Sequence, residues 1–161
     1  MVDETPPHFV SIRPSNNSYI KSSTDITIDA DDSLSDIDSL WFNNGNGTNI
    51  TFTDNVAFNP GFTSEGSNTL TVWVNDSAGN LNHSVYTFRI DNTAPSIISF
   101  SPSNNSNITS SMNFLIDITD AFSGVNASWF NNGNGTNVSF FNNTAFNPGF
   151  TSEGGTYFMY G

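Results

Sequence analysis

Apolar and polar residues alternate along short stretches of this chain, and turn-forming residues separate one stretch from the next. Alternation with a period of two is typical of a strand with one buried face. No stretch sustains the 3.6-residue apolar period of an amphipathic helix. The pattern predicts an all-β protein with seven strands in its first part: Phe9–Arg13, Asp25–Ala30, Ile37–Asn43, Thr48–Thr53, Val56–Phe58, Thr69–Asn75 and Val85–Ile90.

The chain repeats itself at one constant offset. The residues Trp41–Asn49 occur again, unchanged, as Trp129–Asn137, 88 positions further along. At the same offset, Ala57–Gly66 occurs again as Ala145–Gly154. A period of this length is too long for a helical solenoid repeat and suits one small β-domain per copy.

The repeat defines the expected domain organisation. We expect residues 1–6 to end a linker from a preceding repeat, 7–91 to form a complete repeat, 92–95 to form a linker, and 96–161 to form a second repeat. By the offset, the second repeat lacks most of the sixth strand and all of the seventh. We therefore expect a segment of a longer tandem array. The second copy should be loose or should borrow a strand, because apolar faces and a sheet edge are left uncovered.

Comparison of the two copies predicts which face of each strand is buried, since a core face keeps its apolar character. Trp41 is expected at the centre of the core, and Trp73 on the outer face. Two sheets packed face to face satisfy this pattern. The residues expected on the buried faces are Ile26, Ile28 and Ala30 in the second strand, Ile37, Ser39 and Trp41 in the third, Ile50 and Phe52 in the fourth, and Leu70, Val72 and Val74 in the sixth.

The composition excludes several classes of site and partner. The 161 residues carry 15 acidic side chains against 3 Lys and Arg, for a net charge of -12. Such a surface repels phosphate backbones and anionic headgroups, so we expect no nucleic-acid partner. No apolar run approaches the roughly 20 residues of a membrane span, so we expect no direct membrane insertion by this segment. The absence of Cys excludes disulfides and thiolate metal sites.

A family resemblance rests on three stretches: TLTVWVNDSAGN (Thr69–Asn80), YTFRIDNTAP (Tyr86–Pro95) and DAFSGVNASWF (Asp120–Phe130). The first two resemble the strand end and domain junction of bacterial and archaeal immunoglobulin-like repeats. The third is similar to the corner between their second and third strands, where the first copy departs by having Asp36 in place of Gly124.

The resemblance implies tandem immunoglobulin-like β-sandwiches with about seven strands per complete copy. Such repeats form stalks of adhesins, surface-layer-associated proteins and other large secreted proteins. It therefore implies an extracellular or cell-surface location, with signal and anchor outside this segment. The partners it implies are neighbouring repeats of the same chain and cell-surface glycans or proteins.

Acidic residues gather where the second strand leads into the third. In an immunoglobulin-like sandwich, this corner and the Asp76–Asn80 loop lie at the end where the chain enters. Carboxylates converging there could hold Ca²⁺ between domains and stiffen the array. The alternative is that Asp32 and Asp120 cap their own turns and the other acids are solvated. The candidate calcium ligands are Asp3, Asp29, Asp32, Asp76, Asp91, Asp117 and Asp120.

Acceptor motifs for N-glycosylation, Asn-x-Ser/Thr, occur throughout this Asn-rich chain. Such a composition produces many of them by chance, so the motif alone leaves the question open. Asn49 and Thr51 are expected to share an outward face, because Ile50 and Phe52 are expected to point inward. The candidate acceptors are Asn46, Asn49, Asn134 and Asn137.

We expect no enzymatic activity and no catalytic residues, because neither His8 nor His83 belongs to a local catalytic motif. The leading hypothesis is a non-enzymatic extracellular spacer module. The alternative is a carbohydrate- or partner-binding accessory module of a secreted enzyme, with Trp73 as its candidate contact. Four Phe residues of the repeated Ala57–Gly66 motif are expected to pack in the core rather than to bind sugars: Phe58, Phe62, Phe146 and Phe150.

Overall fold

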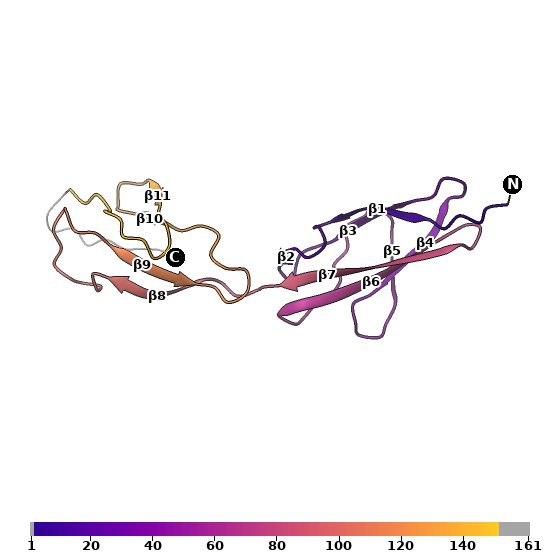
Figure 1. Ribbon diagram of the computed structural model, residues 1–161, viewed down its shortest axis with the longest axis horizontal. Helices are drawn as coiled ribbons and strands as arrows, with labels where there is room; N and C mark the ends of the chain where they lie inside the picture. The colour runs from indigo at the N-terminus through magenta and orange to yellow at the C-terminus, as the bar shows by residue number, and fades with distance from the viewer. Residues whose placement is uncertain (1, 152–161) are drawn as a thin grey trace. The chain divides into compact units, whose positions relative to one another are not determined.

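The computed structural model describes residues 2–151, and the strands carry the all-β fold that the alternation predicts (Figure 1). Within this range no helix is long and apolar enough to cross a lipid bilayer. The chain divides into two compact units, residues 1–92 and residues 93–161.

The first unit contains two sheets among its described residues. A two-stranded antiparallel sheet pairs β1 with β3, and a five-stranded sheet has the order β2-β7-β6-β4-β5. In the larger sheet β2 runs parallel to β7, and the other pairs are antiparallel. The strands are β1 (His8–Arg13), β2 (Tyr19–Ile20), β3 (Thr27–Asp31), β4 (Ile37–Asn43), β5 (Ile50–Phe52), β6 (Gly66–Asp76) and β7 (Leu81–Ile90).

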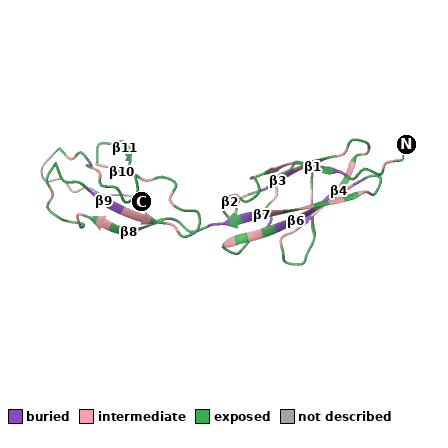
Figure 2. Ribbon diagram, in the orientation of Figure 1, coloured by how far each residue is buried: buried purple, intermediate pink, exposed green. Residues whose placement is uncertain are grey.

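Side chains from both sheets pack into one apolar core. Ile28 of β3 and Leu70 of β6 are fully buried, and Phe9 of β1 packs against the same cluster. Figure 2 shows buried residues at intervals along β6 and β7. Burial at alternate positions follows from the strand pleat, and it confirms the expected inner faces of β3 and β6. Those confirmed core residues are Ile26, Ile28, Ala30, Leu70, Val72 and Val74.

The observed strands differ from the predicted ones in several places. The strand predicted over Val56–Phe58 is wrong, because Phe58 makes only an isolated bridge with Ile26. The short strand Tyr19–Ile20 was not expected, since two residues are too few to show a period. Strand β7 begins at Leu81, four residues before the predicted Val85.

The prediction that Trp41 faces the core is wrong. Phe42 is 2% exposed and belongs to the core, whereas Trp41 lies on the outer face. The register explains this, because Phe42 pairs with buried Val72 and Trp41 pairs with Trp73. Directly opposed residues of an antiparallel pair project from the same face. The two indole rings are parallel, with an interplanar angle of 7° and centroids 6.3 Å apart.

A bulge in β4 explains why the predicted inner positions Ser39 and Trp41 do not face the core. The pairing register shifts between Ile37 and Ser39, so the period of two is broken there. Ile37 packs against the buried group of Ala30 and Leu40, as expected. The Ser39 hydroxyl instead donates to the side chain of Asn75, so the expectation that Ser39 is a core residue is wrong.

Strand β5 follows the predicted inner face only in part. Phe52 packs against the core, as expected. Ile50 lies opposite buried Phe42 and so on the predicted inner face, but it is 43% exposed rather than buried. Phe58 stacks on Phe42 with centroids 4.8 Å apart, and Phe62 is buried. These contacts confirm that the two Phe residues belong to the core.

The second unit contains two antiparallel pairs in its described part, β8 (Ser96–Ser101) with β9 (Leu115–Thr119) and β10 (Trp129–Asn131) with β11 (Asn137–Ser139). Phe114, Ile116 and Phe130 are buried. Phe146 and Phe150 lie in ring contacts with this group, as expected for core residues. Residues 154–161, which match the beginning of β6, lie outside the described residues. The expected lack of most of the sixth strand and all of the seventh in this copy therefore stays a prediction.

Candidate functional site

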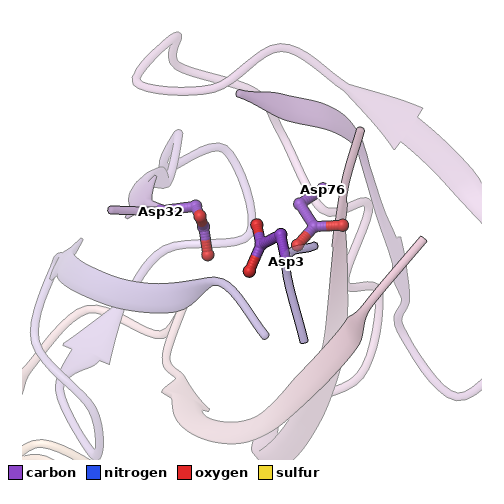
Figure 3. Close-up of side chains that lie close together, drawn as sticks. All are labelled: Asp3, Asp32 and Asp76. Carbon is purple, nitrogen blue, oxygen red and sulfur yellow. The ribbon is translucent and has the colours of Figure 1, made fainter. Parts of the chain in front are cut away.

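Three carboxylates meet at one end of the first unit. Asp3 lies in the segment before β1, Asp32 directly follows β3, and Asp76 is the last residue of β6. One oxygen from each carboxylate lies within 4.8 Å of the others (Figure 3). We refer to these three residues as the Asp3 cluster. It brings together three of the predicted calcium ligands from distant parts of the sequence.

Asp32 also holds its own turn. Its Oδ1 accepts hydrogen bonds from the backbone N–H groups of Leu34 and Ser35, at 2.9 Å each. These bonds, that of Ser35 first, lower the pKa of Asp32 below its ordinary value. Asp32 therefore caps its own turn, as the alternative interpretation expects.

Asp76 is the most enclosed member of the cluster, at 1% exposure. Burial acts to raise the pKa of Asp76, but hydrogen bonds from Asn80, Ser35 and Ala78 outweigh it and hold the pKa below its ordinary value. Oδ1 accepts from the backbone N–H groups of Ala78 and Asn80, and Oδ2 accepts from Asn80 Nδ2 at 2.9 Å. Asp76 is therefore a charged group whose cost of burial is offset by neighbouring donors.

The Asp3 side chain links the chain entry to this corner. Its Oδ1 accepts the N–H of Thr5 at 2.9 Å, and its Oδ2 accepts the hydroxyl of Ser35 at 2.6 Å. Ser35 also donates its backbone N–H to Asp32, so one serine joins two of the three carboxylates. A carboxylate that is already held by hydrogen bonds loses less conformational entropy when it binds an ion.

Two asparagines attach the entering segment to the β6–β7 hairpin. Asn80 Nδ2 donates to the carbonyl oxygens of Asp3 at 3.2 Å and of Thr5 at 3.3 Å. Asn82 Nδ2 donates to the carbonyl of Pro7 at 2.8 Å. The segment from Asp3 to Pro7 is thus fixed along the hairpin by side-chain donors.

The cluster has the chemistry of a hard-cation site. Ca²⁺ takes six to eight oxygen ligands, often from carboxylates and backbone carbonyls. Three carboxylates supply part of such a set, and water would have to supply much of the rest. The same three groups also have a purely structural use, since Asp32 and Asp76 each accept bonds within their own turns and Asp3 accepts the hydroxyl of Ser35 from another loop.

The other predicted ligands lie elsewhere. Asp29 lies within β3, where it pairs with Ser11, and it is not part of the Asp3 cluster. Asp91 follows β7 and is buried, and Asp117 lies within β9. Asp120 caps a turn as Asp32 does: its Oδ1 accepts from the backbone N–H groups of Phe122, Ser123 and Gly124.

Sequence reasoning missed Ser35 and Asn80, which hold the cluster together. A signal was present for each. Ser35 follows Asp32 at the spacing of a side-chain-capped turn, and Asn80 follows Asp76 across a short hairpin turn. Neither signal was decisive, because Asn and Ser are abundant throughout the chain.

The repeated hairpin has the turn chemistry that its Asn-Gly pairs require. Gly45 and Gly47 have φ of 93° and 84°, which only glycine adopts readily. Asn46 lies in this turn and accepts the backbone N–H of Thr48 with its own side chain. Asn49 and Asn137 lie opposite Asn43 and Asn131 in the two copies.

Comparison of the chain with protein-family models, with curated proteins and with solved structures found no match. The resemblance to immunoglobulin-like repeats, the extracellular location and the absence of catalysis therefore remain predictions. Two features of the first unit bear most directly on function: the fastened entering segment and the outer sheet face that carries the stacked indoles of Trp41 and Trp73.

Proposed function

We propose that the chain is a non-enzymatic extracellular spacer, built of tandem immunoglobulin-like β-sandwiches, that holds another part of a larger surface protein at a distance. A spacer needs links that are compact and junctions that do not swing freely. The two sheets of the first unit share one apolar core, which makes that unit a compact link.

One observation carries the proposal: the segment that enters the first unit is fastened to it. Asn80 and Asn82 bind the carbonyls of Asp3, Thr5 and Pro7, and the Asp3 side chain binds Ser35. Pro6 and Pro7 further restrict the backbone of this segment. An entering segment held at several points transmits orientation from one link to the next.

Distances between two spin labels test this proposal. The chain has no Cys, so Val2→Cys and Val85→Cys introduce two unique labelling sites, one in the entering segment and one on exposed β7. We expect a narrow distance distribution that broadens in the Asn80→Ala/Asn82→Ala variant. Asn68→Ala, a change at the other end of the β6–β7 hairpin, is the matched control. A broad distribution in the unsubstituted background would contradict a fastened junction.

Calcium binding at the Asp3 cluster stays a prediction attached to this function. If Ca²⁺ binds, calorimetry will show heat of binding, and the melting temperature of the first unit will rise with Ca²⁺ concentration. Asp76→Asn should abolish both effects, whereas Asp25→Asn, an exposed acid outside the cluster, should leave them unchanged. If calorimetry shows no heat of binding and the melting temperature does not rise, the prediction of calcium binding is wrong. The hydrogen bonds of the entering segment are then the whole mechanism of the junction.

A further inference from the structure

The outer face of the five-stranded sheet carries an aromatic row flanked by neutral polar residues. In register across the strands, Trp41 lies opposite Thr51 on one side and Trp73 on the other, and Trp73 lies opposite His83. No residue of this row is acidic, although the chain has a net charge of -12. The face therefore suits an uncharged, hydroxyl-rich ligand with an apolar side.

A glycosylation acceptor lies in the same register. In Asn49-Ile50-Thr51, the hydroxyl residue Thr51 is directly opposite Trp41. Asn49 is then diagonal to Trp41, a relation that separates Cβ atoms by about 7–8 Å. Asn43 Nδ2 donates to Asn49 Oδ1 at 3.2 Å, and within the described part of the chain Asn49 Nδ2 has no protein acceptor. The atom that would carry a sugar is thus left available beside an indole ring.

The second unit repeats the arrangement. Trp129 lies opposite Ser139, the hydroxyl residue of Asn137-Val138-Ser139, and Asn131 Nδ2 donates to Asn137 Oδ1 at 3.2 Å. Trp129 is 55% exposed. A large exposed indole such as that of Trp129 costs solvation free energy, and in both copies an acceptor asparagine lies diagonal to the Trp, which suggests a common covering group.

The acceptors at the tips of the turns lack this partner. Asn46 and Asn134 use their side-chain oxygens to accept the N–H groups of Thr48 and Thr136, at 2.9 Å each. They lie within the Asn-Gly turns rather than on a strand, and neither faces an aromatic residue across a ladder.

We propose that Asn49 and Asn137 carry N-linked glycans, and that the first sugar of each glycan packs its apolar face on Trp41 or Trp129. In the modification, Asn Nδ2 forms a bond to the anomeric carbon of a lipid-pyrophosphate-linked oligosaccharide. The lipid pyrophosphate leaves, and the amide nitrogen gives up one proton. The inference rests on the proposed extracellular location, because the transferring enzyme acts on secreted chains.

Secretion of the chain from yeast, beside a bacterial cytoplasmic preparation without glycans, tests the assignment. Peptide mass spectrometry after enzymatic glycan release identifies each occupied asparagine. We expect occupancy at Asn49 and Asn137, weaker iodide quenching of Trp emission in the glycosylated chain, and a higher melting temperature. Trp41→Ala should remove the glycan-dependent rise in the melting temperature of the first unit. Leu81→Ala, a change on the exposed end of β7, should leave that rise unchanged.

Three outcomes would overturn the inference. The first is unmodified Asn49 and Asn137 in the secreted chain, and the second is occupancy without any change in quenching. The third is binding of free neutral polysaccharide by the bacterial chain with loss on Trp41→Ala, which would make the row a receptor for external glycan. Yeast passes the chain through its secretory route whatever the natural role, so a negative result speaks against the acceptor and not against the spacer.

Discussion

Trp41 and Trp129 occupy the same place in two copies of one nine-residue sequence, but their surroundings differ. Trp41 is partly covered by the parallel ring of Trp73 on β6. Trp129 is 55% exposed, and the position that matches Trp73 lies outside the described residues. The cover on Trp41 is thus supplied by a strand distant in sequence.

The turns of the two hairpins, by contrast, agree closely. Gly45 and Gly133 both have positive φ, at 93° and 90°. Asn44 Nδ2 donates to the carbonyl of Pro60 at 2.8 Å, and Asn132 Nδ2 donates to that of Pro148 at 3.0 Å. The two turns therefore agree, because both partners of this hydrogen bond, Asn44 with Pro60 and Asn132 with Pro148, lie in repeated sequence, whereas burial depends on the neighbouring strand.

The strongest test of the face assignment is Phe42→Ala. Phe42 is 2% exposed and stacks on Phe58, so its truncation should cost about 3–5 kcal/mol of unfolding free energy in the first unit. Urea unfolding followed by circular dichroism measures this loss. A larger loss for Trp41→Ala than for Phe42→Ala would reverse the assignment of the two faces.

Leu40→Ser gives the first copy the residue that the second copy has at Ser128. Leu40 is 3% exposed in a small group with Ala30 and Val74, so we expect a loss of about 2–4 kcal/mol. The reverse change, Ser128→Leu, should shift stability by at most about 1 kcal/mol, since it also removes the hydrogen bond from Ser128 Oγ to the carbonyl of Phe140. Equal losses from the two changes would show that the copies are packed alike.

Trp41→Ala and Trp129→Ala sharpen the comparison between the two indoles. Loss of the ring pair with Trp73 should cost the unglycosylated chain about 1 kcal/mol. Trp129→Ala should cost less than about 0.5 kcal/mol, because its ring is mainly exposed. Paired thermal melts of the bacterial preparations measure the difference, and its absence would indicate that the indoles share one environment.

The acid response of the first unit should be the smallest of the four effects, because it depends on two carboxylates. Asp32 and Asp76 have folded-state pKa values lowered from 3.8, so their contribution to stability is present above that value and is lost as the pH falls below it. Melting temperatures measured from about pH 7 to about pH 3 should fall mainly at the acidic end. Asp76→Asn should flatten this fall, and an unchanged profile would contradict the role of its hydrogen bonds.

The alternation of the sequence predicted the inner faces of β3 and β6 because their period of two is unbroken at the core positions. It failed in β4, where the bulge between Ile37 and Ser39 changes which residues face inward. Constancy of Trp41 between the two copies does not establish burial, because an outward residue can also stay constant. The register with Trp73, a non-local pairing, was needed to correct it.

The candidate site was predicted in part. Asp3, Asp32 and Asp76 were expected together because the resemblance implied which loops share one end of the fold, and they do meet. Asp29 is not part of this group, and it lies within β3, where it pairs with Ser11. The tie made by Ser35 depends on its hydroxyl reaching Asp3, a contact across 32 residues that no local pattern reveals.

The hydrogen bonds of the repeated turn also determine which of its asparagines deamidates first. Asparagine followed by glycine deamidates when the glycine nitrogen attacks the side-chain carbonyl carbon, which adds a negative charge and an isoaspartate kink. At Asn44 the Gly45 nitrogen is engaged with Asn43 Oδ1, and the Asn44 amide is held by Pro60. The Gly47 N–H donates to no acceptor among the described residues. Asn46, and Asn134 at the matching position of the second copy, are therefore the asparagines of these turns at which deamidation should begin.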